Sequence, residues 1–343
     1  MWFGCKNRYL INNFNFSILP AWWTKNYDMR FGEQYIFDPD YRNGLYEKMK
    51  LAAKERFAAL NPEIAYVGNG ISHPEFANAT PCALFGAQVN YPEDNFPWGH
   101  HLPEDTPYDS LTLPDDIAKT FPYSEVIEQY AYQNRKNGTE EKPTIPVRGF
   151  LNDAFLLFGE RIFLDCLSDP EEAKKVFDTL LALTKKVFEY TYGHLKHRHM
   201  ILITNCTVAM ISPQLYDDML FAYDKEISRL ATEVYGCTFG VHHCGLIDRY
   251  IESYQKLPNV SFVEAGWGSD VKAVLQAFPC ANVNYLLSTP FLNEATVAQA
   301  REMAETLLKA AEGNLSRFSV SAADLDNGPW LDKICAVEEV FRA

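Results

Sequence analysis

The chain has 343 residues, and because a typical domain has about 150, this length predicts two domains or one large barrel. Hydrophobic residues make up 47% of the sequence and aromatic residues 14%, which is enough for a substantial core and excludes a disordered protein. The formal charge of −14, from 31 Lys and Arg against 45 Asp and Glu, gives the surface the wrong sign for binding nucleic acid or an anionic membrane.

The first thirty residues contain apolar side chains but do not form a signal peptide. Asn12, Asn13 and Asn15 interrupt every apolar run before it reaches the necessary length. No stretch of the sequence approaches the roughly 20 apolar residues of a membrane-spanning helix. The eight cysteines include no CxxC pair, so we expect most of them to be buried thiols. Together these features predict a cytoplasmic protein.

The segment before residue 60 differs in composition from the rest of the chain. It is rich in Trp, Tyr, Pro, Asn and Asp, as is the stretch 77–122. Such segments cap a barrel or line a pocket more often than they form a domain of their own. We therefore expect residues 1–60 to be an extension that caps a barrel formed by residues 61–343, with a separate N-terminal domain as the alternative.

Seven short apolar runs predict buried strands. They lie at residues 64–67, 145–150, 200–204, 238–241, 260–263, 283–287 and 318–320. Strands that alternate with helices form parallel βαβ units. With one further strand, these runs suit an α/β fold of the (β/α)₈ TIM-barrel type, which ordinarily needs about 250 residues. A doubly wound sheet is the alternative, but no GxGxxG motif follows a strand.

Three helices are predicted from apolar side chains that recur at helical spacing. The first begins where Asp169 can act as N-cap and Pro170 suits the first helical position, and its apolar face continues to about residue 188. A second helix is expected from about 212 to 230, and a third from about 294 to 311. Each apolar face would pack against the predicted strands.

Polar residues follow many of the predicted strands, at the end where the catalytic groups of a barrel lie. They are 68–70, Asn152 and Asp153, Asn205 and Cys206, 242–244, Glu264, and 321–324. We expect Asp153, Asn205 and Cys206 to contact substrate, with structural hydrogen bonding as the alternative role for the first two. Trp267, which closely follows Glu264, is a candidate pocket wall.

The segment 238–245 (TFGVHHCG) places a histidine and a cysteine at the end of a strand. Because side chains alternate along a strand, His242 and Cys244 face one side while His243 points away. Imidazole and thiolate together suit Zn²⁺. Glu264 ends the next strand, and a buried carboxylate needs a partner. We predict a catalytic zinc site formed by His242, Cys244 and Glu264 with one open position; the alternative is an ordinary buried thiol without metal.

The run 242–270 (HHCGLIDRYIESYQKLPNVSFVEAGWGSD) resembles the zinc-site segment of the uroporphyrinogen decarboxylase-like superfamily. The resemblance is greatest to its zinc-dependent, corrinoid-linked methyltransferases, and the run is also similar to cobalamin-independent methionine synthase. Residues 146–170 (PVRGFLNDAFLLFGERIFLDCLSDP), 205–213 (NCTVAMISP) and 318–342 extend it, so that it covers roughly residues 20–343.

This resemblance implies a (β/α)₈ barrel with zinc at its C-terminal rim. The implied reaction moves a methyl group between a corrinoid, carried by a partner protein, and a thiol or another small acceptor or donor. His242 and Cys244 match the family's His-x-Cys ligands, and Glu264 matches an acidic ligand of the methionine synthase branch. The family's last zinc cysteine should fall within 321–324, where this chain has none. Asp324 could supply an oxygen ligand instead, Cys206 is a less favoured substitute, and otherwise water or substrate fills the position or the metal is lost.

The decarboxylase branch of the superfamily holds its substrate carboxylates with an N-terminal arginine-rich motif. The corresponding stretch here, 20–27, is PAWWTKNY, and the next arginine is Arg30. A strongly acidic protein without these arginines is poorly suited to a polycarboxylate. The remaining alternatives to a methyltransferase are a decarboxylase that acts on a smaller acid, and a barrel that has lost catalysis and binds a corrinoid or aromatic ligand.

Overall fold

Within the described residues, the strands form one large sheet and a two-stranded ribbon. The computed structural model describes residues 8–11, 13–58, 60, 65–67, 74, 76–143, 145, 147–193 and 200–342. The strands are β1 (Arg8–Ile11), β2 (Phe14–Ile18), β3 (Ala65–Val67), β4 (Val89–Asn90), β5 (Trp98–Gly99), β6 (Met200–Thr204), β7 (Thr238–His243), β8 (Val260–Ala265), β9 (Asn282–Leu287) and β10 (Phe318–Leu325).

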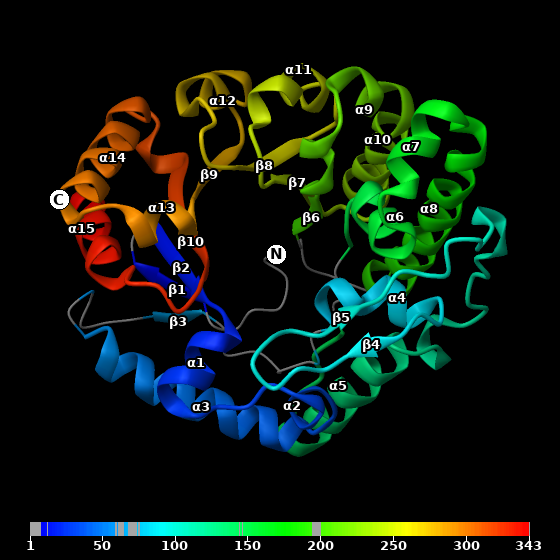
Figure 1. Cartoon of the computed structure of the whole chain (residues 1–343), viewed down its shortest axis with the longest axis horizontal. Helices are drawn as coiled ribbons and strands as arrows, with labels where there is room; N and C mark the ends of the chain where they lie inside the picture. The colour runs from blue at the N-terminus through cyan, green and yellow to red at the C-terminus, as the bar shows by residue number, and fades with distance from the viewer. Residues whose placement is uncertain are drawn as a thin grey trace.

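The large sheet has the order β3-β1-β2-β10-β9-β8-β7-β6. From β2 to β6 all neighbours in this order are parallel, whereas β1 runs antiparallel to both β2 and β3. The sheet curls, and the helices form a ring around it (Figure 1). The predicted α/β fold is therefore confirmed as a curled, six-stranded parallel sheet with an antiparallel addition. Closure into a complete (β/α)₈ barrel stays a prediction.

The helices cover the outer side of the sheet. They are α1 (Pro20–Tyr27), α2 (Glu33–Phe37), α3 (Pro39–Arg56), α4 (Thr80–Leu84), α5 (Tyr123–Asn137), α6 (Phe150–Phe158), α7 (Arg161–Ser168), α8 (Pro170–Tyr192), α9 (Pro213–Met219), α10 (Phe221–Arg229), α11 (Ile251–Tyr254), α12 (Val271–Ala277), α13 (Thr289–Glu294), α14 (Val297–Ala310) and α15 (Leu331–Arg342). Short helical turns lie at Ala77–Ala79, Tyr108–Ser110, Ile117–Lys119, Thr207–Met210, Leu230–Val234, Ile247–Tyr250 and Leu315–Arg317. Within the described residues, no helix is long and apolar enough to cross a membrane.

The predicted helices are present with adjusted ends. The carboxylate of Asp169 accepts a hydrogen bond from the backbone N–H of Glu172, so it caps α8 as expected. The helix predicted at 212–230 is divided into α9 and α10 at Leu220, whose φ of −122° is not helical. The third helix, α14, begins after a capping box formed by Thr296 and Gln299.

Five of the predicted strands correspond to β6 to β10, but the strand predicted at 145–150 is wrong. Residues 147–149 are in no strand, and α6 begins at Phe150. Gly149 makes one backbone hydrogen bond to β6, from its N–H to the carbonyl of Thr204 at 3.1 Å. A Cβ at Gly149 would lie 2.3 Å from Asn205 Oδ1, so this close approach requires glycine. The prediction at 64–67 is met by β3 for residues 65–67, and the predicted polar segment 68–70 lies outside the described residues.

The N-terminal segment contributes to the sheet and to the core. Phe14 and Phe16 in β2 are fully buried, and β2 pairs with β10 near the other end of the chain. Trp22 in α1 is also buried, and its ring centroid lies 5.8 Å from that of Trp330. Phe14, Phe16 and Trp22 therefore pack inside the protein, whereas Tyr27 and Phe37 of the same segment are exposed. The domain boundary at residue 60 stays a prediction.

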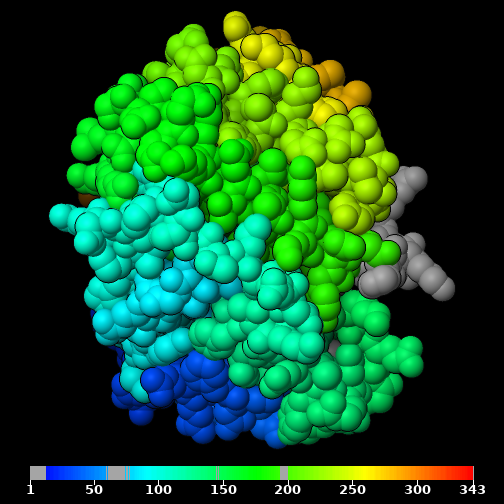
Figure 2. All heavy atoms as spheres, turned by 90° about the vertical axis from the view of Figure 1, so that its right-hand side faces the viewer, coloured from blue at the N-terminus to red at the C-terminus, as the bar shows by residue number. Residues whose placement is uncertain are grey.

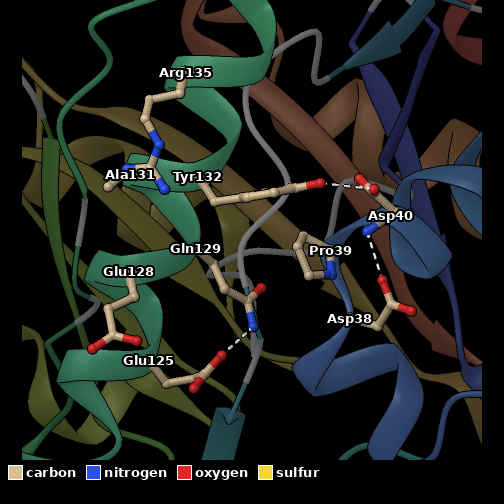
Figure 3. Close-up of a pocket in the computed structure, with 9 residues that line it drawn as sticks. All are labelled: Asp38, Pro39, Asp40, Glu125, Glu128, Gln129, Ala131, Tyr132 and Arg135. Carbon is tan, nitrogen blue, oxygen red and sulfur yellow. Dashed lines mark hydrogen bonds between the residues drawn. The ribbon is translucent and has the colours of Figure 1, made fainter.

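A polar groove of about 430 Å³ separates the start of α3 from α5 (Figure 3). Tyr132 reaches across it and donates a hydrogen bond to Asp40 at 2.8 Å, and Lys136 lies 2.7 Å from the same carboxylate. Asp38 caps α3 by accepting hydrogen bonds from two backbone N–H groups. Asp40 therefore already serves the contact between the two helices, and Asp38 serves the start of α3.

The segment 76–120 packs against the helices that follow it, as the cyan and green regions of Figure 2 show. The N–H of Leu102 donates to the carbonyl of Leu157 in α6 at 2.7 Å, and Lys186 in α8 donates to the carbonyl of Pro114 at 3.0 Å. This long segment is thus attached to the outer wall by backbone and side-chain hydrogen bonds.

Candidate metal site

Three potential metal ligands meet where β6 and β7 end. The ligand atoms of Cys206, His242 and Cys244 all lie within 4.8 Å of one another. His242 Nε2 is 3.2 Å from Cys206 Sγ and 2.8 Å from Cys244 Sγ, and the two sulfur atoms are 2.8 Å apart. In the described part of the chain, this is the one cluster of three or more such residues that could hold a metal ion.

The register of the sheet explains how the two cysteines meet. Thr204 in β6 lies opposite His242 in β7. Because both strands run in the same direction, the residues two positions later, Cys206 and Cys244, come level just beyond the strand ends. His243 points away, as predicted, and its Nδ1 lies 3.0 Å from the hydroxyl of Tyr254.

Glu264 contacts the opposite side of the His242 ring from the two sulfurs. It lies opposite His242 in the register of β7 and β8, and its Oε2 is hydrogen-bonded to His242 Nδ1. Its other oxygen accepts a hydrogen bond from Asn284 Nδ2 at 2.6 Å. Glu264 and His242 are fully buried. The carboxylate predicted as a ligand thus lies next to the imidazole but does not belong to the cluster of three ligand atoms.

The charges in the cluster favour one thiolate. Burial alone would lower the pKa of His242, but the neighbouring Glu264 carboxylate and Cys206 raise it to about 9. A hydrogen bond from Cys244 lowers the pKa of Cys206, as does His242, although burial opposes this. The same hydrogen bond raises the pKa of Cys244. The two sulfurs therefore share one proton, which leaves one of them as a thiolate, the form that binds metals.

Asn205, a predicted substrate contact, is buried behind the cluster. Its Nδ2 donates to the carboxylate of Asp224 at 2.7 Å and lies 3.4 Å from the hydroxyl of Tyr254. Its backbone N–H donates to the carbonyl of His242 at 2.8 Å. These hydrogen bonds hold the residue directly before Cys206, while the predicted substrate contact stays untested.

Asp153, in α6, is paired with Arg148, whose Nε lies 2.7 Å from its Oδ1. Burial raises the pKa of Asp153 while Arg148 opposes the shift. The pair lines a cavity of about 30 Å³ next to Tyr123. This volume is far below that of a typical ligand pocket, about 300 Å³ or more.

Trp267 lies on the helix-covered side of the sheet. Its ring stacks on Phe291 with centroids 4.8 Å apart, and it lines a groove of about 540 Å³ together with Tyr285. Tyr285 pairs with Ala265 in the register, one position beyond the inward-facing pair of Glu264 and Asn284, so it faces the other way. Substrate binding by Trp267 stays a prediction, in a groove that opens away from the cluster.

Asp324, proposed above as an oxygen ligand, is exposed in a left-handed conformation with φ of 56°. Its backbone N–H donates to the hydroxyl of Ser17 at 3.1 Å. The cluster of potential ligands does not include it. In the structure Cys206 occupies the third place of the cluster.

Two polar residues at this site were missed by the sequence reasoning. Asn284 lies in the middle of the apolar run NVNYLL, and Asp224 lies inside α10, where both are buried. A polar side chain within an apolar pattern was the available signal, since burial requires a partner for it.

Comparisons with known proteins identify a fold but no family. No family model and no curated protein matches this sequence. Among solved structures, a methyltransferase from Methanosarcina mazei is similar, with a TM-score of 0.65 and 14% sequence identity, over 95% of this chain and 92% of that chain. The chain therefore shares the fold of that methyltransferase over nearly its whole length, and its Cys-His-Cys cluster has the chemistry to bind a metal ion.

Proposed function

We propose that this protein is a zinc-dependent methyltransferase that moves a methyl group between a corrinoid and a thiol or another small molecule. The observation that carries the proposal is the cluster of Cys206, His242 and Cys244, whose ligand atoms lie within 4.8 Å of one another. The similarity of fold to the archaeal methyltransferase supports the same reaction class.

The donor set fits a catalytic zinc ion. Sulfur from cysteine and nitrogen from histidine are preferred zinc ligands, and catalytic sites combine three protein ligands with one open position. Cys244 is exposed, so the open position would face the solvent side of the site. A bound zinc ion would hold a thiol acceptor as its thiolate, which is the nucleophilic form.

The surrounding residues prepare His242 for this role. Glu264 is hydrogen-bonded to Nδ1 of His242, so the ring keeps a proton there and directs Nε2 at the two sulfurs. We therefore assign Cys206 as the third ligand and Glu264 as the residue that orients the imidazole. The methyl-carrying corrinoid, on a separate protein, is proposed from the sequence resemblance.

The first experiment measures the zinc content of the purified protein and of four single Cys→Ser variants. We expect near-stoichiometric zinc in the wild type and loss of zinc in Cys206→Ser and Cys244→Ser. Cys335→Ser and Cys280→Ser are the matched controls, because Cys335 is half-buried like Cys206 and Cys280 is exposed like Cys244. Absence of zinc from protein prepared without chelator, or its retention in both cluster variants, would refute the proposal.

The second experiment tests the reaction with methylcobalamin and a series of thiols. Methyl transfer breaks the cobalt–carbon bond and forms a sulfur–carbon bond, which changes the visible absorbance of the corrinoid. We expect demethylation by the zinc-loaded wild type and not by Cys244→Ser. Release of carbon dioxide from a small acid without demethylation would favour a decarboxylase instead.

A further inference from the structure

We propose that Asn284 is a positioning residue for the metal site, acting on His242 through Glu264. It belongs to a buried chain of hydrogen bonds that crosses the sheet from β7 to β2. The inference rests on the proposed metal site and adds the means by which the sheet holds the imidazole in place.

The side chain of Asn284, in β9, forms hydrogen bonds to residues of both neighbouring strands, β8 and β10. Its Nδ2 donates to Glu264 at 2.6 Å, and Glu264 in turn contacts Nδ1 of His242. On its other side, Asn284 Oδ1 accepts hydrogen bonds from the hydroxyls of Ser319 at 2.8 Å and Ser321 at 2.9 Å.

The register of the sheet places these residues in one row. His242 lies opposite Glu264, and Glu264 lies opposite Asn284. Asn284 lies opposite Ser319, so the row continues from β9 into β10. Ser321, two positions further along β10, lies opposite Asn15 in β2 and extends the chain to that strand. Its hydroxyl is 2.9 Å from both Asn15 Oδ1 and Asn284 Oδ1, so its one proton is shared between the two amide oxygens. The chain is therefore a consequence of strand pairing and does not depend on a loop.

The orientation of the Asn284 amide follows from its neighbours. An ionised carboxylate only accepts hydrogen bonds, so the amide nitrogen must face Glu264 and the amide oxygen must face the two serine hydroxyls. Donors from both sides, His242 and Asn284, thus converge on Glu264. This arrangement keeps the carboxylate turned toward Nδ1 and leaves Nε2 directed at the sulfurs.

Burial prevents water from replacing the Asn284 donor. Glu264 is 0% and Asn284 2% exposed. Without the amide, Glu264 Oε1 would lose this buried hydrogen bond, and the orientation of the carboxylate toward His242 would be less constrained. Residues that orient metal-binding histidines in this way typically change metal affinity by about 10- to 100-fold when replaced.

The test compares zinc affinity in Asn284→Leu and in a matched control, Gln129→Met. Leucine has a similar shape to asparagine but no donor. Gln129, in α5, is a similarly buried amide at 4% exposure, and its contacts are to Ile36, Arg42 and Glu125. Zinc dissociation constants are measured by competition with a chelator, and thermal unfolding of the metal-free proteins is recorded. We expect about 10- to 100-fold weaker zinc binding in Asn284→Leu and a change within about twofold in Gln129→Met.

A double-mutant cycle separates positioning from a general loss of stability. If Asn284 acts through Glu264, Asn284→Leu should have little further effect on zinc affinity in a Glu264→Ala background, which lacks the carboxylate that accepts the Asn284 hydrogen bond. An equal loss of affinity in both backgrounds, or an unchanged dissociation constant in Asn284→Leu, would overturn the inference. If Asn284→Leu fails to fold, the double variant Ser319→Ala, Ser321→Ala removes the two hydroxyl groups that hold Asn284 Oδ1. This double variant should also bind zinc more weakly. An unchanged zinc affinity in it overturns the inference as well.

The outcomes distinguish this inference from the proposed function. If the wild-type protein binds zinc through Cys206 and Cys244 but Asn284→Leu leaves the zinc dissociation constant unchanged, the positioning role alone is refuted. A wild-type protein that binds no zinc refutes the proposed function, and the positioning role with it.

Discussion

Replacing Asp224 by asparagine tests the energetic cost of the buried negative charge next to Asn205, the residue before Cys206. Asp224 is 1% exposed, and its Oδ2 accepts hydrogen bonds from Tyr216 and Asn205, both at 2.7 Å. An asparagine in its place can offer its amide oxygen to the same two donors. The variant therefore removes the buried negative charge while keeping the hydrogen bonds from Asn205 and Tyr216.

The expected effect follows from the pKa of Asp224. Burial raises this pKa from 3.8 to about 6, although the hydrogen bonds from Tyr216 and Asn205 oppose the rise. Between these values the folded state binds more protons than the unfolded state, so stability falls as pH rises. The shift of about two units corresponds to about 3 kcal/mol of stability that is present at pH 4 and lost above pH 6. Asp224→Asn should therefore be the more stable protein at neutral pH.

The assay is urea unfolding of the metal-free protein between pH 4 and pH 7.5, with chelator present so that metal binding does not contribute. We expect Asp224→Asn to exceed the wild type by up to about 3 kcal/mol at pH 7.5, and the difference to disappear toward pH 4. Asp115→Asn, at an exposed position, makes the same change in charge and should show no such dependence. A variant that is less stable than the wild type at pH 7.5, or a difference independent of pH, would refute this reasoning.

Two further predictions test the residues that lie outside the cluster. Asp324→Ala should leave zinc affinity within about twofold, because this carboxylate is exposed and its backbone contacts Ser17; a loss of tenfold or more would show that it is a ligand. Trp267→Leu should lower the free energy of unfolding by about 1 to 3 kcal/mol, because it removes the stacking on Phe291, without changing zinc affinity. Trp98→Leu, at a more exposed position, is the control for urea unfolding; weaker zinc binding in the Trp267 variant without loss of stability would contradict the prediction.

The parallel strands β6 to β10 could be predicted because they are short, largely apolar runs. The strand β2 (FNFSI) was missed because its polar residues resemble those of an exposed or irregular segment. Asn15 and Ser17 are nevertheless buried, and their partners lie about 300 positions away, at Ser321 and Asp324. Reading along the chain cannot supply such partners. The false strand at 145–150 has a related cause, since an apolar run alone does not show whether a neighbouring strand accepts its hydrogen bonds.

At the site, alternation along one strand was enough to bring His242 and Cys244 to the same side. The position of Cys206 depends on the register between β6 and β7, which pairs Thr204 with His242. The sequence indicated that both segments end at the same rim, but not that two sulfurs would come within 2.8 Å. Likewise, adjacency of strands predicted the contact of Glu264 with His242 but not which ring nitrogen it would meet.

The place of the cluster in the sheet order has a mechanical consequence. Among the described strands, β6 is the outermost of the parallel set and pairs with β7 alone. An ion held by Cys206 on one side and by His242 and Cys244 on the other would cross-link the ends of these two strands, 36 residues apart along the chain. Binding to the folded state would then protect the β6 amides from hydrogen exchange in proportion to metal occupancy. Metal loading and the integrity of the sheet edge would be a single linked equilibrium.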